Sequence, residues 1–184
     1  MDRSSAIGFR QISEDTVFEG KIIRVAVGEF VTPSGKTVTR ELVRHPGAVA
    51  VVPILDDHVV MVRQYRAAIG DDLLEIPAGK RDVADEPPEL TAEREVMEEV
   101  GLRPKSLELL ARFYNSAGFC DEFCYVYLAT EFEESAIEAH GEEEQHMIVE
   151  RIPLDNVYAM IADGRLVDSK SIIGLTLALR RLGR

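Results

Sequence analysis

Hydrophobic and polar positions alternate along the first part of the chain in a way that is typical of β-strands. Residues 21–31 and 37–44 both alternate and carry β-branched side chains, and the turn-forming segment Pro33-Ser34-Gly35-Lys36 lies between them. This arrangement predicts an antiparallel β-hairpin. Residues 48–55 form a nearly continuous apolar run, which predicts a strand covered on both faces. Two further strands are expected at 58–65 and 73–76.

The pattern changes to that of a helix over residues 86–100. Two prolines near its start suit a first helical turn, and Gly101 suits the position just past its end. The later predicted elements are strands at 107–114, 123–130 and 147–152, an acidic loop at 131–144, and helices at 154–162 and 168–182, the last capped by Asp168 or Ser169. Mixed strands enclosed between helices predict an α/β fold, specifically an α/β/α sandwich with a mixed sheet.

The 86–100 helix gathers three glutamates on one side. Glu95, Glu98 and Glu99 fall within one sector of about 100° around the helix axis. Like charges at this spacing destabilise a helix. The cluster is therefore expected to be neutralised by a hard divalent cation, for which carboxylate oxygen is a preferred ligand. The apolar residues on roughly the opposite side, expected to face a core, are Leu90, Met97 and Val100.

Glutamate-rich helix faces are most often simply exposed to solvent, so a solvated face is the alternative to a metal site. Here the same helix carries Arg94, which is placed to offset part of the negative charge. The loop Ile76-Pro77-Ala78-Gly79 precedes the helix, and Gly101 closes it. These neighbouring features favour a metal site over a solvated face.

The composition is that of a globular protein of ordinary domain size. The chain has 184 residues, of which 46% are hydrophobic, and a formal net charge of −12. This charge argues against nucleic acid as a partner, because a phosphate backbone would be repelled. No apolar run approaches the length of a membrane span, and the polar start lacks the apolar segment of a secretory signal. We therefore expect a cytoplasmic protein with neither a nucleic-acid nor a membrane partner.

The segment from Gly79 to Leu102 resembles the Nudix box, the signature of hydrolases that cleave a nucleoside diphosphate linked to another group. Its second half, Arg94-Glu95-Val96-Met97-Glu98-Glu99-Val100-Gly101-Leu102, matches the family pattern at every specified position. The first half carries one extra residue, since six rather than five residues separate Gly79 from Glu86. The insertion falls in the turn before the helix, where loops absorb length at little cost. The resemblance implies a Nudix-like α/β/α sandwich with the box beside the sheet.

Segments outside the box resemble the ADP-ribose pyrophosphatase branch of this family. One departure concerns a proline that usually stands sixteen residues after the last glycine of the box, where this chain has Ala117. Such a proline stiffens a loop that approaches the substrate, because it fixes one backbone angle. Its absence leaves room for other sugar nucleotides such as GDP-mannose. The resembling segments are the N-terminal hairpin, Gln64-Tyr65-Arg66, and residues 74–79, 118–122 and 164–169.

The resemblance implies a role for each acidic residue of the box. Glu95, Glu98 and Glu99, together with the backbone carbonyl of Ala78, are implied to hold Mg²⁺, for which Mn²⁺ substitutes. We also expect Glu98 to be one of the catalytic residues. Water bound to such ions becomes acidic, and the same ions neutralise charge on the pyrophosphate.

Three further roles lie outside the box. A general base is implied within Glu142-Glu143-Glu144, with Glu143 favoured over Glu144. Arg66 is expected to bind the diphosphate, because a guanidinium suits bidentate phosphate contact. Arg40 is implied to reach the site of a partner subunit, which requires a homodimer built through the N-terminal strands.

Together these features predict an enzyme of two regions. Residues 1–45 form an N-terminal β region that dimerises, and residues 46–184 form the Nudix hydrolase domain. The expected reaction is Mg²⁺-dependent hydrolysis of ADP-ribose or a related nucleoside diphosphate sugar, giving a nucleoside monophosphate and a sugar phosphate. One alternative is a nucleoside triphosphate pyrophosphohydrolase, against which the hairpin and the late acidic loop argue. The other is a non-catalytic nucleotide-binding module, which usually lacks a box glutamate.

Overall fold

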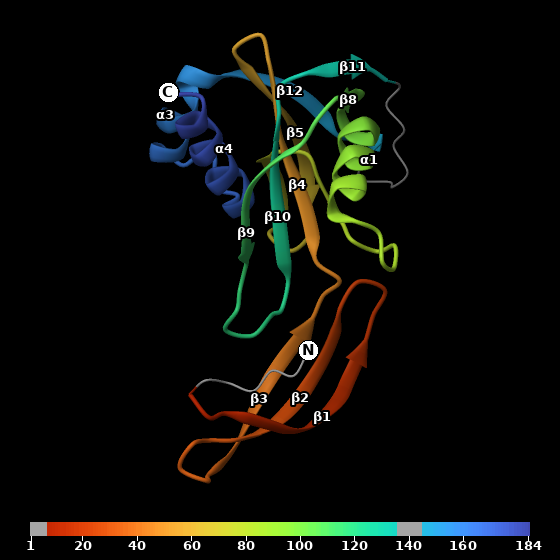
Figure 1. Ribbon diagram of the computed structural model, residues 1–184, viewed down its shortest axis with the longest axis vertical. Helices are drawn as coiled ribbons and strands as arrows, with labels where there is room; N and C mark the ends of the chain where they lie inside the picture. Colours follow the sequence, from red (N-terminus) through yellow and green to blue (C-terminus); the bar gives the residue numbers. More distant parts are fainter. Residues whose placement is uncertain (1–6, 136–144) are drawn as a thin grey trace. The chain divides into compact units, whose positions relative to one another are not determined.

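The computed structural model describes residues 7–135 and 145–184 of the chain. The chain forms two compact units, and each is described by itself. The first comprises Met1–Gly47 and Tyr114–Phe123, and the second comprises Ala48–Phe113 and Cys124–Arg184. Strands β1 to β3 belong to the first unit, and the labelled helices belong to the second (Figure 1).

The first unit contains a three-stranded antiparallel sheet in the order β1-β2-β3. Strands β2 and β3 form the predicted hairpin, paired from Arg24 opposite Arg44 to Val31 opposite Thr37. In its turn Gly35 has a φ of 83°, a left-handed conformation that glycine adopts without strain. The bounds are β1 Arg10–Glu19, β2 Arg24–Val31 and β3 Thr37–Arg44. Strand β1 was not expected from the sequence.

The second unit is built on a mixed sheet, as predicted. Its main order is β12-β5-β4-β10-β9, with β6 paired to β5 and β7 paired to β4. β4 runs parallel to β10 but antiparallel to β5, and β12 runs antiparallel to β5. The strands are β4 Ala48–Leu55, β5 His58–Arg66, β6 Asp71–Glu75, β7 Ala78–Lys80, β9 Glu108–Tyr114, β10 Phe123–Ala129 and β12 Ile148–Pro153, and a separate pair is formed by β8 Leu102–Pro104 and β11 Phe132–Glu134.

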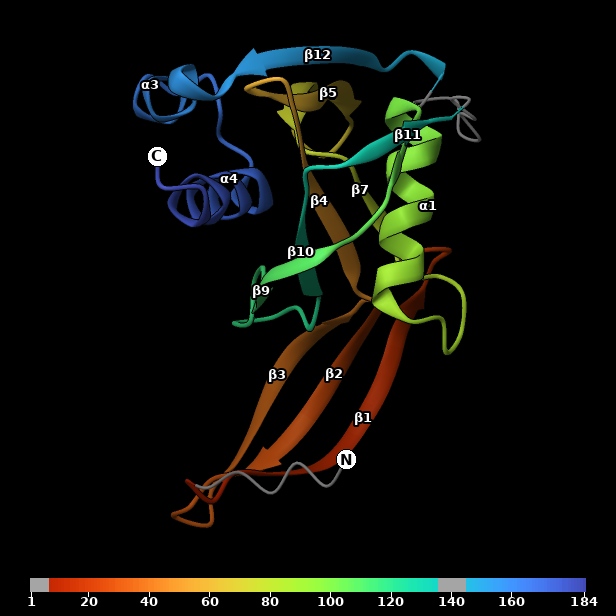
Figure 2. The same ribbon diagram turned by 45° about the horizontal axis from the view of Figure 1, so that its top comes forward.

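Helices cover both faces of this sheet. Figures 1 and 2 show α1 on one side and α3 and α4 on the other. The expected α/β/α sandwich is therefore confirmed. The helices are α1 Pro88–Val100, α3 Val157–Ala162 and α4 Ser169–Arg181, and a short 3₁₀ helix, η1 Leu154–Asn156, precedes α3.

Strand β4 is the centre of the core, and its successive side chains point to opposite faces. Val49 and Val51 pack with Val96 of α1. Ala50 and Val52 pack in the other cluster, which includes residues of α4. Six of the eight β4 residues are buried, which confirms a strand covered on both faces. This two-sided packing places α1 and α4 at fixed positions relative to the strands between them.

Helix α1 begins at Pro88 rather than at residue 86. It ends as predicted at Val100, and Gly101 follows as its C-cap with a φ of 68°. Its buried apolar residues include Ala92, Val96 and Val100, which are spaced four residues apart. The expectation that Leu90 faces the core was wrong, because this side chain is 54% exposed. Leu90 lies two residues before Ala92, which turns it about 200° away from the buried side.

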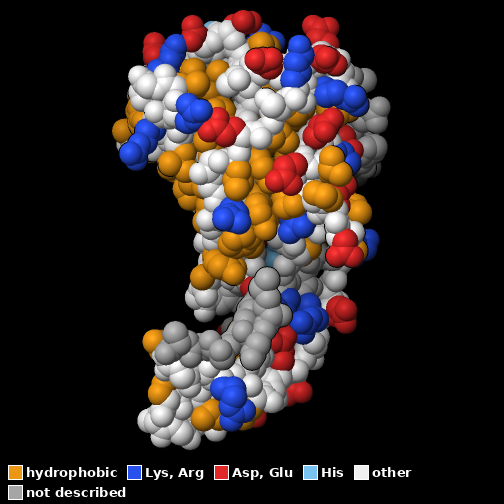
Figure 3. Space-filling view, viewed as in Figure 1, with side chains coloured by type: hydrophobic (Ala, Val, Ile, Leu, Met, Phe, Trp, Pro, Cys, Tyr) orange, Lys and Arg blue, Asp and Glu red, His pale blue; other side chains and the backbone are white. Residues whose placement is uncertain are grey.

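The surface mixes charges of both signs. Figure 3 shows acidic and basic side chains interspersed on the visible face of the second unit, around hydrophobic side chains that lie over β9 and β10. Leu109 of β9, for example, is 43% exposed. Among the residues that the structure describes, no helix is both long and apolar enough to cross a membrane.

Candidate active site

The segment that joins β6 to β7 is held in place by neighbouring elements. The N–H of Ile76 donates to Ser171 Oγ of α4 over 2.9 Å. The carbonyl of Pro77 accepts a 2.9 Å hydrogen bond from the N–H of Val51 in β4. Ser171 is fully buried, so the Ile76 bond is protected from water. The segment is therefore fixed to both β4 and α4.

At the end of this segment, two glutamates of α1 contact the Ala78-Gly79 pair. Glu99 Oε2 accepts a 3.1 Å hydrogen bond from the N–H of Ala78, and this residue is only 8% exposed. The carboxylate of Glu95 lies over Gly79, so that a Cβ built on Gly79 would stand 1.9 Å from Glu95 Cδ. Only glycine leaves room for a carboxylate at this point.

The third glutamate of the cluster is joined to the first by an arginine. Arg94 Nη1 lies 2.9 Å from Glu95 Oε1 and 3.1 Å from Glu98 Oε2. Partial burial lowers the pKa of Arg94, but the charges of Glu95 and Glu98 outweigh this effect and raise that pKa above its ordinary value. Arg94 therefore stays charged and holds the two carboxylates beside one another.

The loop before α1 absorbs the extra residue of the box. Asp85 takes up a left-handed backbone conformation with a φ of 61°. Directly after it, Glu86 Oε2 accepts a 2.7 Å hydrogen bond from Thr91 Oγ1 and lies 3.9 Å from Arg94 Nη2. Arg81 Nη2 donates to the backbone carbonyl of Glu86 over 3.1 Å. The insertion thus leaves Glu86 next to the arginine of the glutamate cluster.

Arg66, at the end of β5, is clamped by a buried carboxylate. Its Nε donates to Glu75 Oε1 over 2.5 Å and its Nη2 donates to Glu75 Oε2 over 2.7 Å. The Glu75 hydrogen bonds raise the pKa of Arg66, although burial acts against them. These bonds use two of the five N–H donors of the guanidinium, whose other edge carries the rest. The Arg66 side chain is 40% exposed, whereas that of Glu75 is 1% exposed.

A second cation, Lys170 of α4, contacts the same carboxylate. Lys170 Nζ forms an ion pair with Glu75 and lies 3.0 Å from Asp168 Oδ1. Asp168 caps α4, because its Oδ2 accepts a 2.9 Å hydrogen bond from the N–H of Ser171. Burial raises the pKa of Glu75, but Arg66 and Lys170 together outweigh burial and lower it. Glu75 is therefore an ionised carboxylate inside the protein.

The model of the NUDIX domain family matches residues 44–172, which is more than half of the chain. The chain belongs to the NUDIX family. The resemblance seen in its box is thereby confirmed.

Relatives of this Nudix chain carry different names. An ADP-ribose pyrophosphatase of Mycobacterium tuberculosis is 41% identical over 168 residues, covering 91% of this chain and 81% of the relative. A methanol dehydrogenase activator of Bacillus methanolicus is 35% identical over 167 residues, covering 90% of each chain. The solved structure of an ADP compounds hydrolase superposes with a TM-score of 0.83 over 96% of both chains, at 22% identity. That likeness confirms the Nudix fold.

The structure brings the expected metal ligands of the Nudix box to one place. Glu95 and Glu99 contact the Ala78-Gly79 pair, and Arg94 connects Glu98 to Glu95. Within the described ranges, no three acidic, histidine or cysteine side chains already form a metal-binding group. The donor set nevertheless fits a hard divalent cation, because it supplies only oxygen ligands.

The other predicted site residues lie in different parts of the chain. Arg40 is exposed on β3 of the first unit, where its Nη1 donates to the carbonyl of Thr39 over 2.7 Å. Glu143 and Glu144, the predicted general bases, lie outside the described residues. Arg66 belongs to the same unit as the glutamates, and the charge of Glu99 contributes to its raised pKa after the Glu75 contacts and burial.

Sequence reasoning missed Glu75 and Lys170. A usable signal was present, since Glu75 interrupts the apolar run of Leu73, Leu74 and Ile76. A charged residue inside a buried strand requires a partner of opposite charge. Its second partner, Lys170, lies 95 residues further along the chain, so no local pattern identifies it.

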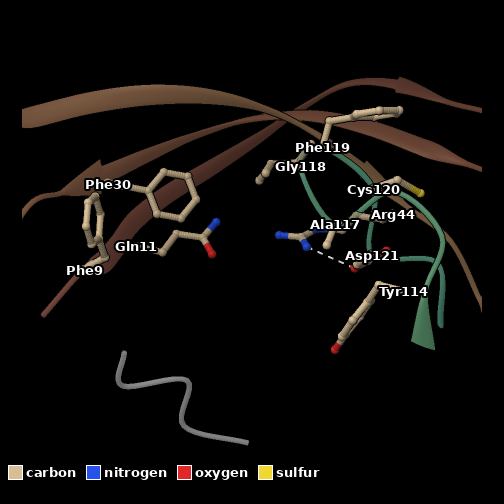
Figure 4. Close-up of a pocket in the computed structure, with 11 residues that line it drawn as sticks. Phe9, Gln11, Phe30, Arg44, Tyr114, Ala117, Gly118, Phe119, Cys120 and Asp121 are labelled. Carbon is tan, nitrogen blue, oxygen red and sulfur yellow. Dashed lines mark hydrogen bonds and ion pairs between the residues drawn. The ribbon is translucent and has the colours of Figure 1, made fainter. Parts of the chain in front are cut away.

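The first unit contains a separate pocket with a volume of about 350 Å³. Figure 4 shows four aromatic side chains around it: Phe9, which precedes β1, Phe30 of β2, Tyr114 at the end of β9, and Phe119 in the loop that follows β9. Ala117 is also among the lining residues. The loop is anchored by Asp121, whose Oδ2 accepts from Arg44 Nη1 over 3.0 Å and whose Oδ1 accepts from the N–H of His45 over 2.9 Å. Without a proline at position 117, these bonds still tie the loop to β3.

Proposed function

We propose that the protein hydrolyses the pyrophosphate bond of ADP-ribose or a related nucleoside diphosphate sugar, giving a nucleoside monophosphate and a sugar phosphate. The observation that carries this proposal is the gathering of Glu95 and Glu99 on the Ala78-Gly79 pair, with Glu98 joined to Glu95 through Arg94. The relative from Mycobacterium tuberculosis, an ADP-ribose pyrophosphatase, supports the choice of substrate.

The metal that we propose is Mg²⁺, with Mn²⁺ as a substitute. Glu95, Glu98, Glu99 and the backbone carbonyl of Ala78 would hold it. When bound, such a cation supplies an acidified water and neutralises charge on the pyrophosphate. The protein contributes the placement of the ligands, because Arg94 and the Ala78 amide orient the carboxylates.

Arg66 is our candidate for the diphosphate contact. It presents one edge of its guanidinium to Glu75 and retains donors on the other edge. We assign the general base to Glu143, with Glu144 as the second choice, and we keep Glu98 among the catalytic residues. The roles of Arg66, Glu98, Glu143 and Glu144 are assigned from the resemblance of this chain to Nudix hydrolases.

We further propose that residues 1–45 form a homodimer and that residues 46–184 form the hydrolase domain. Strand β1 supports the dimer, because it is an edge strand of its sheet and exposes large apolar side chains. In such a dimer Arg40 would serve the site of the partner subunit. A cytoplasmic location, without nucleic-acid or membrane partners, completes the proposal. The exposed apolar residues of β1 include Ile12, Val17 and Phe18.

Product analysis tests the function. The purified protein is incubated with Mg²⁺ and, in turn, ADP-ribose, GDP-mannose, NADH, diadenosine polyphosphates and nucleoside triphosphates. We expect AMP and ribose 5-phosphate from ADP-ribose, or the matching pair from another sugar nucleotide. Release of pyrophosphate from triphosphates alone would support the triphosphate alternative. Metal binding without turnover of any compound would support a non-catalytic binding module.

A further inference from the structure

Glu75 lies between two cations that come from different elements. Arg66 of β5 makes a bidentate pair with it, and Lys170 of α4 contacts Oε2, the oxygen that also accepts from Arg66 Nη2. The carboxylate is 1% exposed and the Lys170 side chain is 13% exposed, so water screens these charges weakly. Each contact therefore affects the other strongly.

Arg66 shares the negative charge of Glu75 with Lys170. A single carboxylate paired with Arg66 alone would cancel the charge of the guanidinium. Lys170 draws on the same carboxylate, and its second partner, Asp168, is also used to cap α4 through Ser171. The charge of Glu75 is therefore divided between two cations, and the edge of Arg66 that faces away from Glu75 keeps its N–H donors and its share of the guanidinium charge.

The positions of Glu75 and Lys170 are also fixed by their neighbours. Lys170 lies next to Ser171, whose hydroxyl accepts from the N–H of Ile76, the residue that follows Glu75. Further along α4, Gly174 packs so closely on the sheet that an added Cβ would lie 2.9 Å from Val126 Cγ1. The position of Lys170 relative to Glu75 is thus set by close packing between α4 and the sheet.

We propose that Lys170 and Glu75 are positioning residues for Arg66, fixing its orientation and leaving it a positively charged edge for the diphosphate of the substrate. The inference rests on the proposed function, in which Arg66 binds that diphosphate. Neither residue touches the substrate. Lys170 acts through Glu75, and Glu75 acts through Arg66.

A double-mutant cycle separates this role from a merely structural one. Lys170→Met removes the charge and keeps the length of the side chain, and Arg66→Met removes the residue through which Lys170 acts. The measured quantity is the affinity of the full-length protein for ADP in the presence of Mg²⁺, with AMP as the comparison, together with KM and kcat for ADP-ribose. Arg181→Met is the matched control, because it removes a cation from the same helix whose side chain is 61% exposed and paired with Glu108.

We expect Lys170→Met to weaken ADP binding and raise KM by roughly tenfold, but to change ADP binding by less than about twofold when Arg66 is already Met. Lys170→Arg should restore most of the affinity, and Arg181→Met should change it little. Equal fold-changes in both backgrounds, or no change in either, would overturn the proposal. So would a parent protein that binds ADP no more tightly than AMP. If the cycle behaves as expected but no sugar nucleotide is cleaved, the positioning role stands and the proposed function fails.

Discussion

Glu95 occupies the space that a side chain at position 79 would need. A Cβ on Gly79 would lie 1.9 Å from Glu95 Cδ and 2.2 Å from each carboxylate oxygen. The glycine of the box is thus required by the approach of a carboxylate, and this approach brings α1 and the end of the β6–β7 segment together. The spacing between Gly79 and Glu95 in the box therefore reflects a close approach of these two residues in the fold.

Gly79→Ala should therefore displace the Glu95 carboxylate. We expect kcat/KM for ADP-ribose to fall by roughly 100-fold, because small misplacements of site groups cost about this much. The melting temperature should change little in comparison. Gly164→Asn is the control, since Gly164 has open space around it and a φ of 79° that asparagine tolerates. Unchanged kinetics for Gly79→Ala would contradict the role assigned to this contact.

Ser171→Ala tests the link between α4 and the site segment. The substitution leaves the N–H of Ile76 without its 2.9 Å partner in a fully buried position. We expect the free energy of unfolding to fall by about 1–3 kcal/mol, the cost of a buried unsatisfied donor. Chemical denaturation measures this, with the exposed Ser106→Ala as the control. A loss no larger than that of the control would show that the bond does not hold the segment.

Glu14 provides a prediction about pH. The hydrogen bond from Arg44 lowers the pKa of Glu14 from 4.5 to about 2, although burial acts against it. A lowered folded-state pKa means that the ion pair stabilises the protein fully above pH 4.5 and that this contribution is lost as the pH falls toward 2. Because the pair is partly solvated, we expect a contribution of roughly 1 kcal/mol.

Comparing the parent protein with Glu14→Gln across this pH range measures the effect. The difference in the free energy of unfolding should be present at pH 6 and should shrink steadily as the pH falls below 4.5. A difference that does not depend on pH would show that Glu14 stabilises the first unit by packing or neutral hydrogen bonds.

Much of the fold follows from local patterns in the sequence. The β2–β3 hairpin was predicted because its turn residues and flanking alternation are contiguous, and β4 because a long apolar run requires cover on both faces. Strand β1 was missed because most of its residues are exposed, so hydrogen bonding to β2 rather than burial defines it. Leu90 was misplaced because the sequence gives the period of a helix more reliably than the direction of its buried side.

Some residues of the site are likewise predicted by local sequence patterns, whereas others are not. The box spacing predicts that Glu95, Glu98 and Glu99 share a side of α1, because helical geometry is local. The contacts of Glu75 with Lys170 depend on packing between elements far apart in the chain. Such pairs follow from the tertiary structure, and the sequence shows only that Glu75 interrupts the apolar residues Leu73, Leu74 and Ile76.

The most direct test of the proposed metal site is to measure ADP-ribose turnover and Mn²⁺ affinity for Glu99→Gln beside Glu93→Gln. Both substitutions remove one carboxylate from α1, but Glu93 points to Arg103, 3.8 Å away, and its side chain is 38% exposed. We expect Glu99→Gln to lower kcat by roughly 100-fold or more and to weaken Mn²⁺ binding, while Glu93→Gln stays close to the parent. Turnover and Mn²⁺ affinity of Glu99→Gln close to those of the parent would contradict the assignment of the metal to this cluster.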